Sequence, residues 1–315
     1  MLNIWQQLKK PIWCLAPMFG ATDSAFRQLL AEIGKPDLMF TEFTNVQALF
    51  SPDETAIQQL AFTDKEQPLI AQIWGLDPEL FEAAADFIAA AGFAGIDINM
   101  ACPVKAVVKK GAGGALIDNP SLAGQMIQAA LKGAAGRIPV SVKTRLGNQT
   151  IVTETWLKFL LNFDLAAISV HCRTTKALSL GPTHWEEISK IVRLRNQLKS
   201  KTLIIGNGDI FSREIARQRI RETKVDGVMI GRGVFADPYI FNPQKIINNQ
   251  SKTQKLKLLK KHLDIYQKTW GKTRSYHPLK RFFKIYVNGF HGAMSLRVKL
   301  MNTRSITAAR AIIDE

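Results

Sequence analysis

Residues 12–20 read IWCLAPMFG, and this stretch decides between two fold classes. Its apolar part is expected to form a strand over Ile12–Pro17, and Met18 follows without any glycine-rich turn. An open, doubly wound sheet usually carries a G-x-G-x-x-G turn directly after its first strand. Because that turn is absent, the stretch favours an α/β fold of the (β/α)8 TIM-barrel type over the doubly wound alternative.

Similar apolar runs recur along the chain and alternate with helical patterns. Most are continuous rather than alternating, which is typical of strands covered on both faces. The further strands expected are Leu38–Phe43, Leu69–Trp74, Gly95–Met100, Pro139–Lys143, Ala166–His171, Leu203–Asn207 and Asp226–Ile230. Helices are expected to begin at Asp23, Asp77, Asn119 and Ser212, whose side chains can cap a helix N-terminus. Eight such units in about 240 residues predict a barrel.

The composition and the periodicity of the sequence change from about Pro243 onwards. Residues 248–252, NNQSK, have the composition of a linker. Beyond them Leu, Ile, Phe and Tyr recur at helical spacing among Lys and Arg, and no further strand is expected. The sequence therefore predicts a catalytic barrel domain over residues 1–245 and a small, basic helical domain over residues 251–315.

Positive charge is concentrated in the C-terminal fifth of the chain. Residues 251–315 hold 15 Lys and Arg against 3 Asp and Glu, a balance of +12, whereas the whole chain carries +16. Such asymmetry indicates a polyanionic partner, either a nucleic acid or an anionic membrane surface. The alternative is a solvated basic face that serves only solubility.

Composition narrows the class of protein further. Hydrophobic residues make up 46% of the 315 residues, which is enough for a large core. No apolar run reaches the ~18 residues that span a bilayer, and the first ten residues do not resemble a signal peptide. The three cysteines are too scattered for a disulfide framework, and no Cys or His pair has metal-ligand spacing. We expect a cytoplasmic protein without a membrane segment or a bound metal.

Polar residues stand at the carboxyl ends of six consecutive expected strands. In a barrel these ends converge on one rim, where the chemistry of such folds is located. Any one of them has a bland explanation as an exposed side chain, but six in a row predict a site. The residues are Gln72, Asn99, Cys102, Lys143, Arg145, His171, Arg173, Asn207, Gly208, Asp209, Gly231 and Arg232.

The last two strand ends carry glycines, at 208 and at 231 and 233. Many barrels bind a phosphate after strands seven and eight, where glycine allows backbone N–H groups to approach the oxygens. Arg232 would add a fixed positive charge. Tight turns also require glycine, so the alternative is two turns without a ligand.

Cys102 follows a buried strand and precedes Pro103, at the start of a loop that is first basic and then glycine-rich over residues 105–114. We expect this loop to be mobile and its thiol to be able to react. Cys14 lies within the first strand, where a free cysteine is ordinary core packing. Cys172 receives no role.

Taken together, these segments resemble the tRNA-dihydrouridine synthase family over most of residues 12–241, and the basic tail corresponds to that family's tRNA-binding domain. The motifs that carry the resemblance occur in family order. They are Leu15-Ala16-Pro17-Met18 with Thr22-Asp23, Thr41-Glu42, Gln72 with Gly75, Asp97-Ile98-Asn99-Met100 with Cys102-Pro103, Gly114-Ala115-Leu116, Val142-Lys143-Thr144-Arg145 with Gly147, His171 with Arg173-Thr174, Asn207-Gly208-Asp209 and Met229-Ile230-Gly231-Arg232-Gly233.

The resemblance implies an enzyme that binds FMN, takes a hydride from NADPH and reduces a uridine of tRNA to dihydrouridine. A one-to-one complex with tRNA needs no dimer, so we expect a monomer, although the sequence leaves the oligomeric state open. The resemblance also implies hydride transfer from flavin N5 to C6 of the base and a proton from Cys102, the catalytic acid, to C5. The substrate would be oriented by Asn99, Arg145 and Arg173. The cofactor would be held by Pro17, Met18, Phe19, Gln72, Lys143, His171, Asn207, Gly208, Asp209, Gly231 and Arg232.

The sequence departs from the family pattern near the expected substrate. Ala101 replaces the usual glycine before the cysteine, Phe19 is unusually bulky, and Ala177 and Ser179 stand where many members have Gln and Tyr. These changes leave open which uridine is reduced. Three other functions also stay open: a flavin enzyme acting on a free pyrimidine, a Schiff-base enzyme using Lys143, and a tRNA-binding protein without chemistry.

Overall fold

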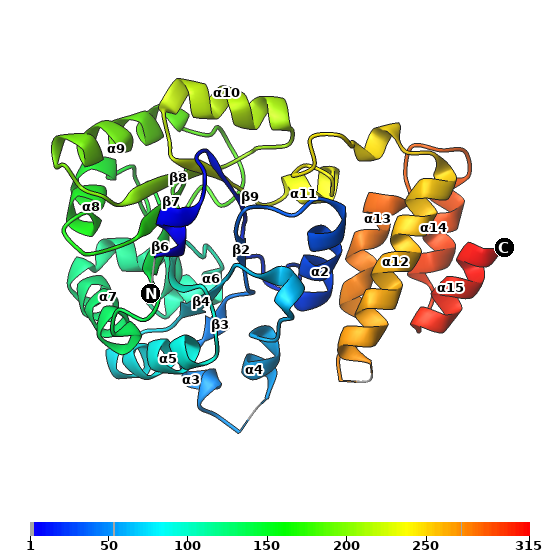
Figure 1. The fold of residues 1–315 in the computed structure, drawn as a ribbon, viewed down its shortest axis with the longest axis horizontal. Coiled ribbons are helices and arrows are strands. Elements are labelled where there is room, and N and C mark those ends of the chain that lie inside the picture. The colour runs from blue at the N-terminus through cyan, green and yellow to red at the C-terminus, as the bar shows by residue number, and fades with distance from the viewer. Residues whose placement is uncertain (1–2, 53, 272) are drawn as a thin grey trace.

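The computed structural model describes residues 3–52, 54–271 and 273–315. It consists of an α/β barrel and a group of helices beside it, formed by the C-terminal part of the chain (Figure 1). Both the barrel and the presence of C-terminal helices agree with the fold predicted from the sequence.

Eight parallel strands form a nearly closed barrel in the described part of the chain. Their order is β1-β9-β8-β7-β6-β5-β4-β2, and a bridge between Cys14 and Leu38 brings β1 next to β2. A ninth, two-residue strand, β3, pairs with β4 outside this order. The strand bounds are β1 Ile12–Leu15, β2 Met39–Phe40, β3 Thr44–Asn45, β4 Leu69–Trp74, β5 Gly95–Met100, β6 Val140–Arg145, β7 Ala167–His171, β8 Leu203–Asn207 and β9 Gly227–Ile230.

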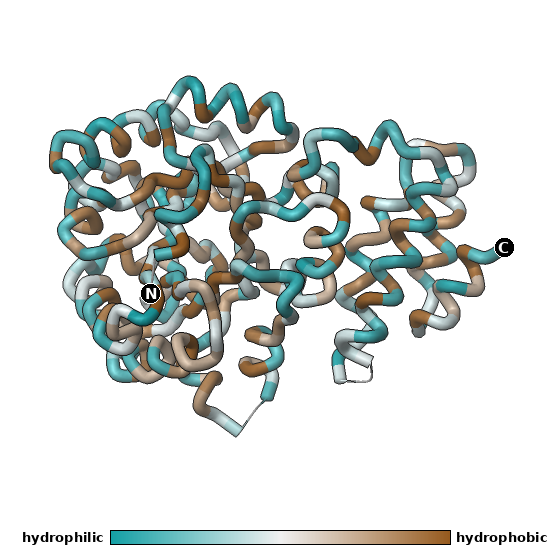
Figure 2. Tube along the Cα trace, viewed as in Figure 1, coloured by the Kyte–Doolittle hydropathy of each residue, from teal (hydrophilic) through white to brown (hydrophobic). Residues whose placement is uncertain are grey.

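Helices surround the barrel. The caps expected at Asp23, Asp77, Asn119 and Ser212 are all present, each with a side-chain oxygen accepting a backbone N–H of the first turn. Figure 2 shows that α10 is mainly hydrophilic, since it buries few residues. The helical segments up to residue 249 are α1 Ile4–Gln7, α2 Ser24–Ile33, α3 Val46–Leu49, α4 Thr55–Gln59, η1 Asp64–Glu66, α5 Pro78–Ala90, α6 Lys105–Lys109, η2 Gly113–Asp118, α7 Pro120–Ala134, α8 Thr153–Leu160, α9 Trp185–Gln197, α10 Arg213–Thr223, α11 Gly233–Ala236 and η3 Ile247–Asn249.

The barrel interior changes from apolar to polar along the strands. Side chains two residues apart point the same way, so Ile70 of the apolar interior is followed by Gln72, and Ala167 by Ser169. At the amino ends the interior is filled by a cluster that includes Trp5 of α1. The polar layer therefore lies at the carboxyl ends, where a barrel carries its site.

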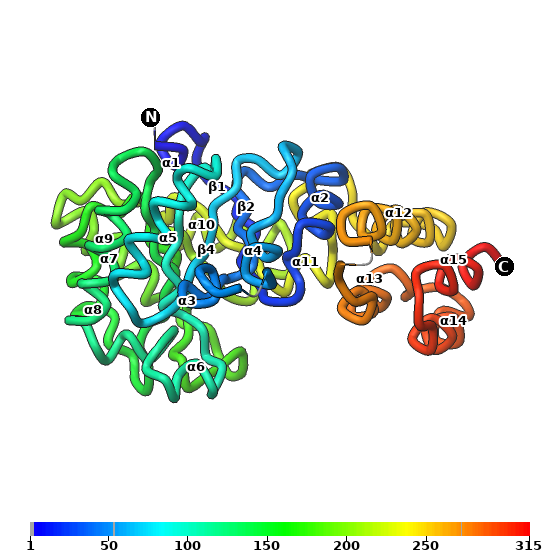
Figure 3. The backbone as a smooth tube through the Cα atoms, turned by 90° about the horizontal axis from the view of Figure 1, so that it is seen from below, coloured from blue at the N-terminus to red at the C-terminus, as the bar shows by residue number. Residues whose placement is uncertain are grey.

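The C-terminal helices pack against α2 and α11 of the barrel (Figures 1 and 3). Phe26 of α2 stacks on Phe282 with ring centroids 4.8 Å apart, and Phe235 and His262 complete this contact. One hydrophobic core is thus continuous between the two regions. The remaining helical segments are α12 Lys252–Trp270, η4 His277–Phe282, α13 Phe283–Tyr286, α14 Ala293–Met301 and α15 Ile306–Asp314.

Two segments differ from their expected form. The basic, glycine-rich segment 105–114 contains the short helix α6, which begins two residues after Pro103. The expected linker is partly ordered: η3 buries Ile247, and Ser251 caps α12 in a capping box with Gln254. No helix of the described chain is long and apolar enough to cross a membrane. In the same residues, no cluster of His, Cys, Asp and Glu is arranged to bind a metal ion.

Candidate active site

A cavity of about 140 Å³ opens at the carboxyl ends of the strands. Most of the residues expected at the rim line it, together with Ser179, one of the departures from the family pattern. The expected residues in its wall are Pro17, Met18, Lys143, Arg145, His171, Asn207, Gly208, Asp209, Gly231 and Arg232. Phe19, Gln72, Asn99, Cys102 and Arg173 lie outside this lining.

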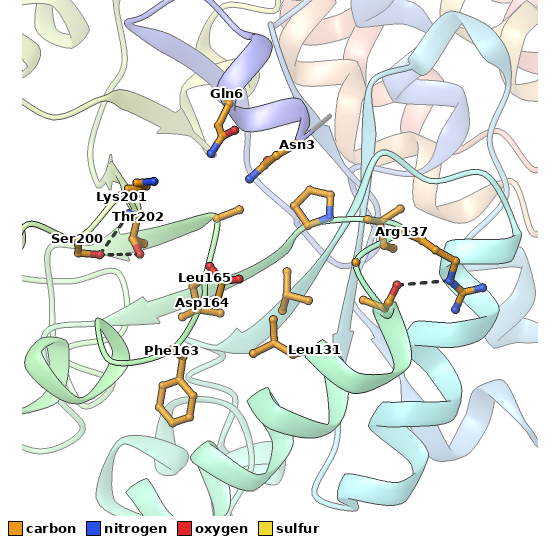
Figure 4. Close-up of a pocket in the computed structure, with 16 residues that line it drawn as sticks. Asn3, Gln6, Leu131, Arg137, Phe163, Asp164, Leu165, Ser200, Lys201 and Thr202 are labelled. Carbon is orange, nitrogen blue, oxygen red and sulfur yellow. Dashed lines mark hydrogen bonds between the residues drawn. The ribbon is translucent and has the colours of Figure 1, made fainter. Parts of the chain in front are cut away.

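A larger cavity of about 560 Å³ lies at the opposite end of the barrel. Figure 4 shows Asn3 and Gln6 on one side of it and Leu131 and Leu165 on the other. It is bordered by the starting residues of strands such as Val140. None of the expected site residues lines it, and barrels place their chemistry at the other end, so the smaller cavity is the candidate active site.

The turn after β8 is shaped around Cys172. Gly208 has a φ of +138°, and a Cβ at this position would lie 2.3 Å from the Cys172 sulfur. Only glycine fits such a turn. Cys172 is fully buried, and burial raises the pKa of its thiol to about 12, so it packs as an apolar residue beneath the cavity.

Asp209 holds two arginines at the cavity edge. Both terminal nitrogens of Arg173 donate to its carboxylate, at 3.0 and 2.5 Å, and Arg232 donates at 2.6 Å. The hydrogen bond from Arg173 lowers the pKa of Asp209, which therefore stays ionised. Arg232 remains half exposed at the cavity, whereas Arg173 is buried and also donates to the Gly181 carbonyl.

Lys143 carries a buried positive charge with no hydrogen-bond partner in the described residues. Burial, and then the Arg145 guanidinium, lower the pKa of Lys143 to about 8, although Asp97 opposes them. Ser169 pairs with Lys143 in register, and its buried hydroxyl is also unpartnered among these residues. Lys143 and Ser169 are thus two donors inside the mouth without an acceptor in the described part of the chain, and the buried Ser169 hydroxyl in particular is costly to leave unpaired.

His171 is neutral. Its burial, followed by the charges of Arg145 and Lys143, places its pKa well below the usual range. Arg145 approaches the His171 Nδ1 at 3.4 Å, and an arginine can only donate. Nδ1 is therefore the acceptor and Nε2 carries the proton, which makes His171 a donor at that nitrogen.

A chain of hydrogen bonds links the expected residues Gln72 and Asn99 to Asp97. The Gln72 side-chain amide donates to Asp97 at 2.6 Å, and the Asn99 side-chain amide donates to the side-chain oxygen Oε1 of Gln72 at 3.0 Å. Ser141 donates to the other oxygen of Asp97 at 2.6 Å. Burial raises the pKa of Asp97 to about 6. The network fixes which way the Gln72 amide faces.

The Cys102 loop is held from two sides. The Asn99 side-chain oxygen accepts the backbone N–H groups of Ala101 and Cys102, and Arg145 donates to the Ala101 carbonyl at 2.7 Å. Burial raises the pKa of Cys102 despite the nearby positive charges of Arg145 and Lys143. The thiol therefore stays protonated near neutral pH, as a proton donor requires.

Ser169 was not singled out from the sequence, and Asp97 was quoted there only as part of a family motif, without a role in the site. An available signal was polarity within an apolar strand, since Asp97 stands between Ile96 and Ile98. Ser179, on the loop after β7, was named only as a departure from the family pattern, and the structure places it in the cavity wall. The expectation that Cys14 packs in the core is confirmed, because it belongs to the apolar barrel interior.

Comparison with known proteins gives one consistent family. The model of the family described as dihydrouridine synthase (Dus) matches residues 14–314. A Bacillus subtilis (strain 168) protein named "Probable tRNA-dihydrouridine synthase 2" is 44% identical, covering 99% of this chain and 96% of its own length. A Staphylococcus aureus (strain COL) protein named "Probable tRNA-dihydrouridine synthase" is 43% identical, covering 99% and 95%.

Solved structures resemble the fold at low identity. The old yellow enzyme homologue from Zymomonas mobilis has a TM-score of 0.52 at 13% identity, covering 75% of this chain and 89% of that one. Histamine dehydrogenase from Rhizobium sp. 4-9 has a TM-score of 0.57 at 14% identity, covering 84% and 51%. These likenesses show the barrel fold.

Proposed function

The chain belongs to the dihydrouridine synthase family, and on this premise we propose that it is a flavin-dependent oxidoreductase that reduces specific uridines of tRNA to 5,6-dihydrouridine. One observation carries the proposal most directly. A cavity suited to an anionic cofactor and a protonated thiol, Cys102, share one barrel mouth, joined by Arg145.

The residues of the cavity fit FMN. Gly231 and Arg232 would hold its phosphate, because a glycine backbone admits close approach and the arginine brings charge. The ionised Asp209 carboxylate would accept hydrogen bonds from hydroxyl groups of the ribityl chain. The unpartnered Lys143 and Ser169, with the oriented Gln72, offer donors to the polar edge of the ring. When bound, FMN would supply the hydride for the C5–C6 bond of uracil, with NADPH as the reductant.

Cys102 would deliver a proton to C5 of the base. Adding a hydride to C6 places negative charge toward O4, and the thiol then gives its proton as the C5–H bond forms. Its raised pKa keeps that proton available. Arg145 and His171 line the same cavity, and donors on Arg145 and the Nε2 of His171 would stabilise the charge that develops on the base.

Asn99 and Arg173 were expected to contact the substrate, but in the structure their polar atoms form hydrogen bonds within the protein. Asn99 bonds to the Cys102 loop and to Gln72, and Arg173 to Asp209 and Gly181. We propose that they position Cys102 and Asp209. Arg145 also donates to backbone carbonyls through Nε and Nη1, and we propose that its Nη2, which has no partner among the described residues, contacts the base. Direct substrate contact by Asn99 or Arg173 stays a prediction.

The C-terminal helices would anchor the tRNA. Several of their basic residues are exposed and have no acidic partner among the described residues. These are Lys252, Lys257, Lys268, Arg281, Lys284, Lys299 and Arg304. Phosphate contacts by such side chains supply most sequence-independent affinity for nucleic acids. We propose a cytoplasmic monomer that binds one tRNA.

The proposal is tested with the purified full-length chain. We expect a yellow protein that retains FMN, oxidises NADPH and forms dihydrouridine in unmodified tRNA. Free uridine, supplied as a matched substrate without the tRNA body, should react far more slowly. A colourless protein that cannot be reconstituted with FMN would refute the flavin site. Equal turnover of uridine and tRNA would instead favour the free-pyrimidine alternative.

A further inference from the structure

Three aromatic side chains form a line along the barrel mouth, which we call the aromatic wall: Phe19, Phe43 and Trp74. They come from the ends of three neighbouring strands, β1, β2 and β4. The ring centroids of Phe19 and Phe43 are 5.4 Å apart, and those of Phe43 and Trp74 are 6.5 Å apart. Phe43 and Trp74 pack on the small cluster that contains Cys102. The wall therefore leads from the outer rim to the proposed proton donor.

Only the outermost ring of the wall is open to solvent. Phe19 is 59% exposed, whereas Phe43 and Trp74 are half-buried; Phe43 packs on Phe19, and Trp74 packs on Phe43. The backbone on either side of Phe19 is fixed: Met18 N–H donates to Thr22 at 2.9 Å, and Gly20 N–H donates to the buried Glu42 at 2.5 Å. A rigid loop thus presents an aromatic face that core packing does not use.

Positive charges flank the wall at both ends. The Arg281 guanidinium lies against Gly20, close enough that a Cβ there would be 3.0 Å from its Nη1. It is exposed and has no acidic partner in the described chain. Beyond Cys102, Lys105 and Lys109 of α6 are exposed as well. The arrangement matches a nucleotide chain, whose bases stack on aromatic rings while its phosphates meet cations.

The wall also adjoins the helices proposed to anchor the tRNA. Arg274 of that region donates to Glu42 at 3.2 Å, and Glu42 holds the Phe19 loop through Gly20. Arg281 comes from the same helical region. The Phe19 loop is thus held next to the helical region that is proposed to anchor the tRNA.

We propose that the aromatic wall is a stacking subsite for one unpaired nucleobase of the tRNA, next to the uridine that enters the cavity. Phe19 is the platform, Phe43 and Trp74 are its support, and Arg281 contacts the adjoining phosphate. This inference rests on the proposed function. The occupant is a base outside the cavity, distinct from the reduced uridine.

The test is a coupling measurement between a side chain and a base. Affinity for a labelled, unmodified tRNA transcript is measured with wild-type chain, Phe19→Ala and Phe19→Tyr. Each is also measured with transcripts abasic at single positions within two nucleotides of the reduced uridine. FMN content is determined for every variant, because the Phe19 backbone belongs to the proposed cofactor site. Phe87→Ala removes a partly exposed ring on the outer helix α5 and is the matched control.

We expect Phe19→Ala and one abasic position each to weaken binding by about tenfold, the scale of one base stacked on an aromatic ring. Combining the two should weaken it no further. The affinity of Phe19→Tyr should stay within about twofold of that of the wild type, and the affinity of Phe87→Ala should equal that of the wild type. Additive losses at every abasic position, or wild-type affinity of Phe19→Ala, would overturn the inference alone. A wild-type chain that binds no tRNA would overturn both this inference and the proposed function.

Discussion

Cys102 is the residue on which the proposed chemistry depends. We expect Cys102→Ala to reduce dihydrouridine formation by at least a hundredfold, because general acid catalysis contributes factors of about 10² to 10⁴. FMN binding should persist, since Cys102 does not line the cofactor cavity. Dihydrouridine counts and flavin absorbance measure the two effects. Cys14→Ala is the control, a change in the apolar interior that should keep turnover. Full activity of Cys102→Ala would show that another group donates the proton.

Lys143 predicts a pH dependence of cofactor binding. Its pKa is lowered to about 8, chiefly by burial, so the ammonium loses its proton as the pH rises from 7 to 9. The charged form is the one that attracts the anionic cofactor, so FMN affinity should fall severalfold over that interval. Fluorescence titrations at each pH measure it. Lys143→Gln should bind FMN more weakly and show a flatter profile. The same slope in that variant would assign the titration to another group.

The turn after β8 provides a prediction at the scale of one element. Gly208→Ala should lower FMN affinity and thermal stability, because its Cβ would meet the Cys172 sulfur at 2.3 Å. Gly92→Ala is a matched control, since Gly92 also has a positive φ, +85°, but nothing within 4 Å. Both changes incur backbone strain on the order of 1–2 kcal/mol. Only the first should alter FMN binding, as measured by flavin titration.

A second substitution separates the clash from the strain. Adding Cys172→Ala to Gly208→Ala removes the sulfur and should restore part of the FMN affinity and of the melting temperature. No recovery would mean that the φ of +138°, rather than the contact with Cys172, makes glycine necessary.

Most strands could be predicted within two residues, because each is a continuous apolar run buried on both faces. The second strand is the exception, since Leu38–Phe43 was expected and β2 covers only Met39–Phe40. The reason is Thr41, whose hydroxyl accepts the Gln72 N–H at 3.0 Å in place of a backbone carbonyl and so ends the regular ladder. Side-chain substitution of this kind leaves no trace in hydrophobic periodicity.

The rim residues could be predicted as a set, because parallel strand ends converge. Their pairings could not. Whether Gln72 faces Asp97 depends on the register between β4 and β5, which only the folded sheet fixes. The bond between Arg173 and Asp209 joins residues 36 positions apart, across two loops. The position of a residue in the sequence therefore indicates whether it lies at the rim, whereas the tertiary structure decides whether its side chain contacts the cavity.

At the scale of the whole molecule, hydrogen bonds and core packing connect the barrel to the C-terminal helices. Trp270 donates to Asp23 at 2.9 Å, Arg274 to Glu42, and Phe282 packs on Phe26. Removing the helices would expose this core and deprive the buried Asp23 and Glu42 carboxylates of the Trp270 and Arg274 donors. Truncation near residue 245 would therefore destabilise the barrel as well as remove basic charge, so a change of charge alone is the sharper test.

Neutralising three exposed lysines of the tail should weaken tRNA binding and its salt dependence. We expect Lys257→Gln, Lys268→Gln and Lys284→Gln together to reduce the slope of log affinity against log salt by about 2, since each phosphate contact contributes about 0.7–0.9. Binding titrations at several salt concentrations provide the slope.

The control for that variant carries the same change in charge on the barrel surface. Lys158, Lys199 and Lys224 are exposed there, and replacing each by Gln should leave the slope near that of the wild type. Equal effects of the two triple variants would mean that the protein attracts tRNA through its net charge, without a defined anchor on the C-terminal helices.

The central claim is that this chain makes dihydrouridine in tRNA. Mass-spectrometric mapping of tRNA from a strain lacking the chain, before and after incubation with the purified protein, FMN and NADPH, tests it most directly. We predict that defined uridines gain two hydrogens after incubation with the wild-type protein and that Cys102→Ala leaves them unchanged. Uridines that stay unreduced with flavin-loaded wild-type protein, or dihydrouridine already complete in the deletion strain, would contradict it.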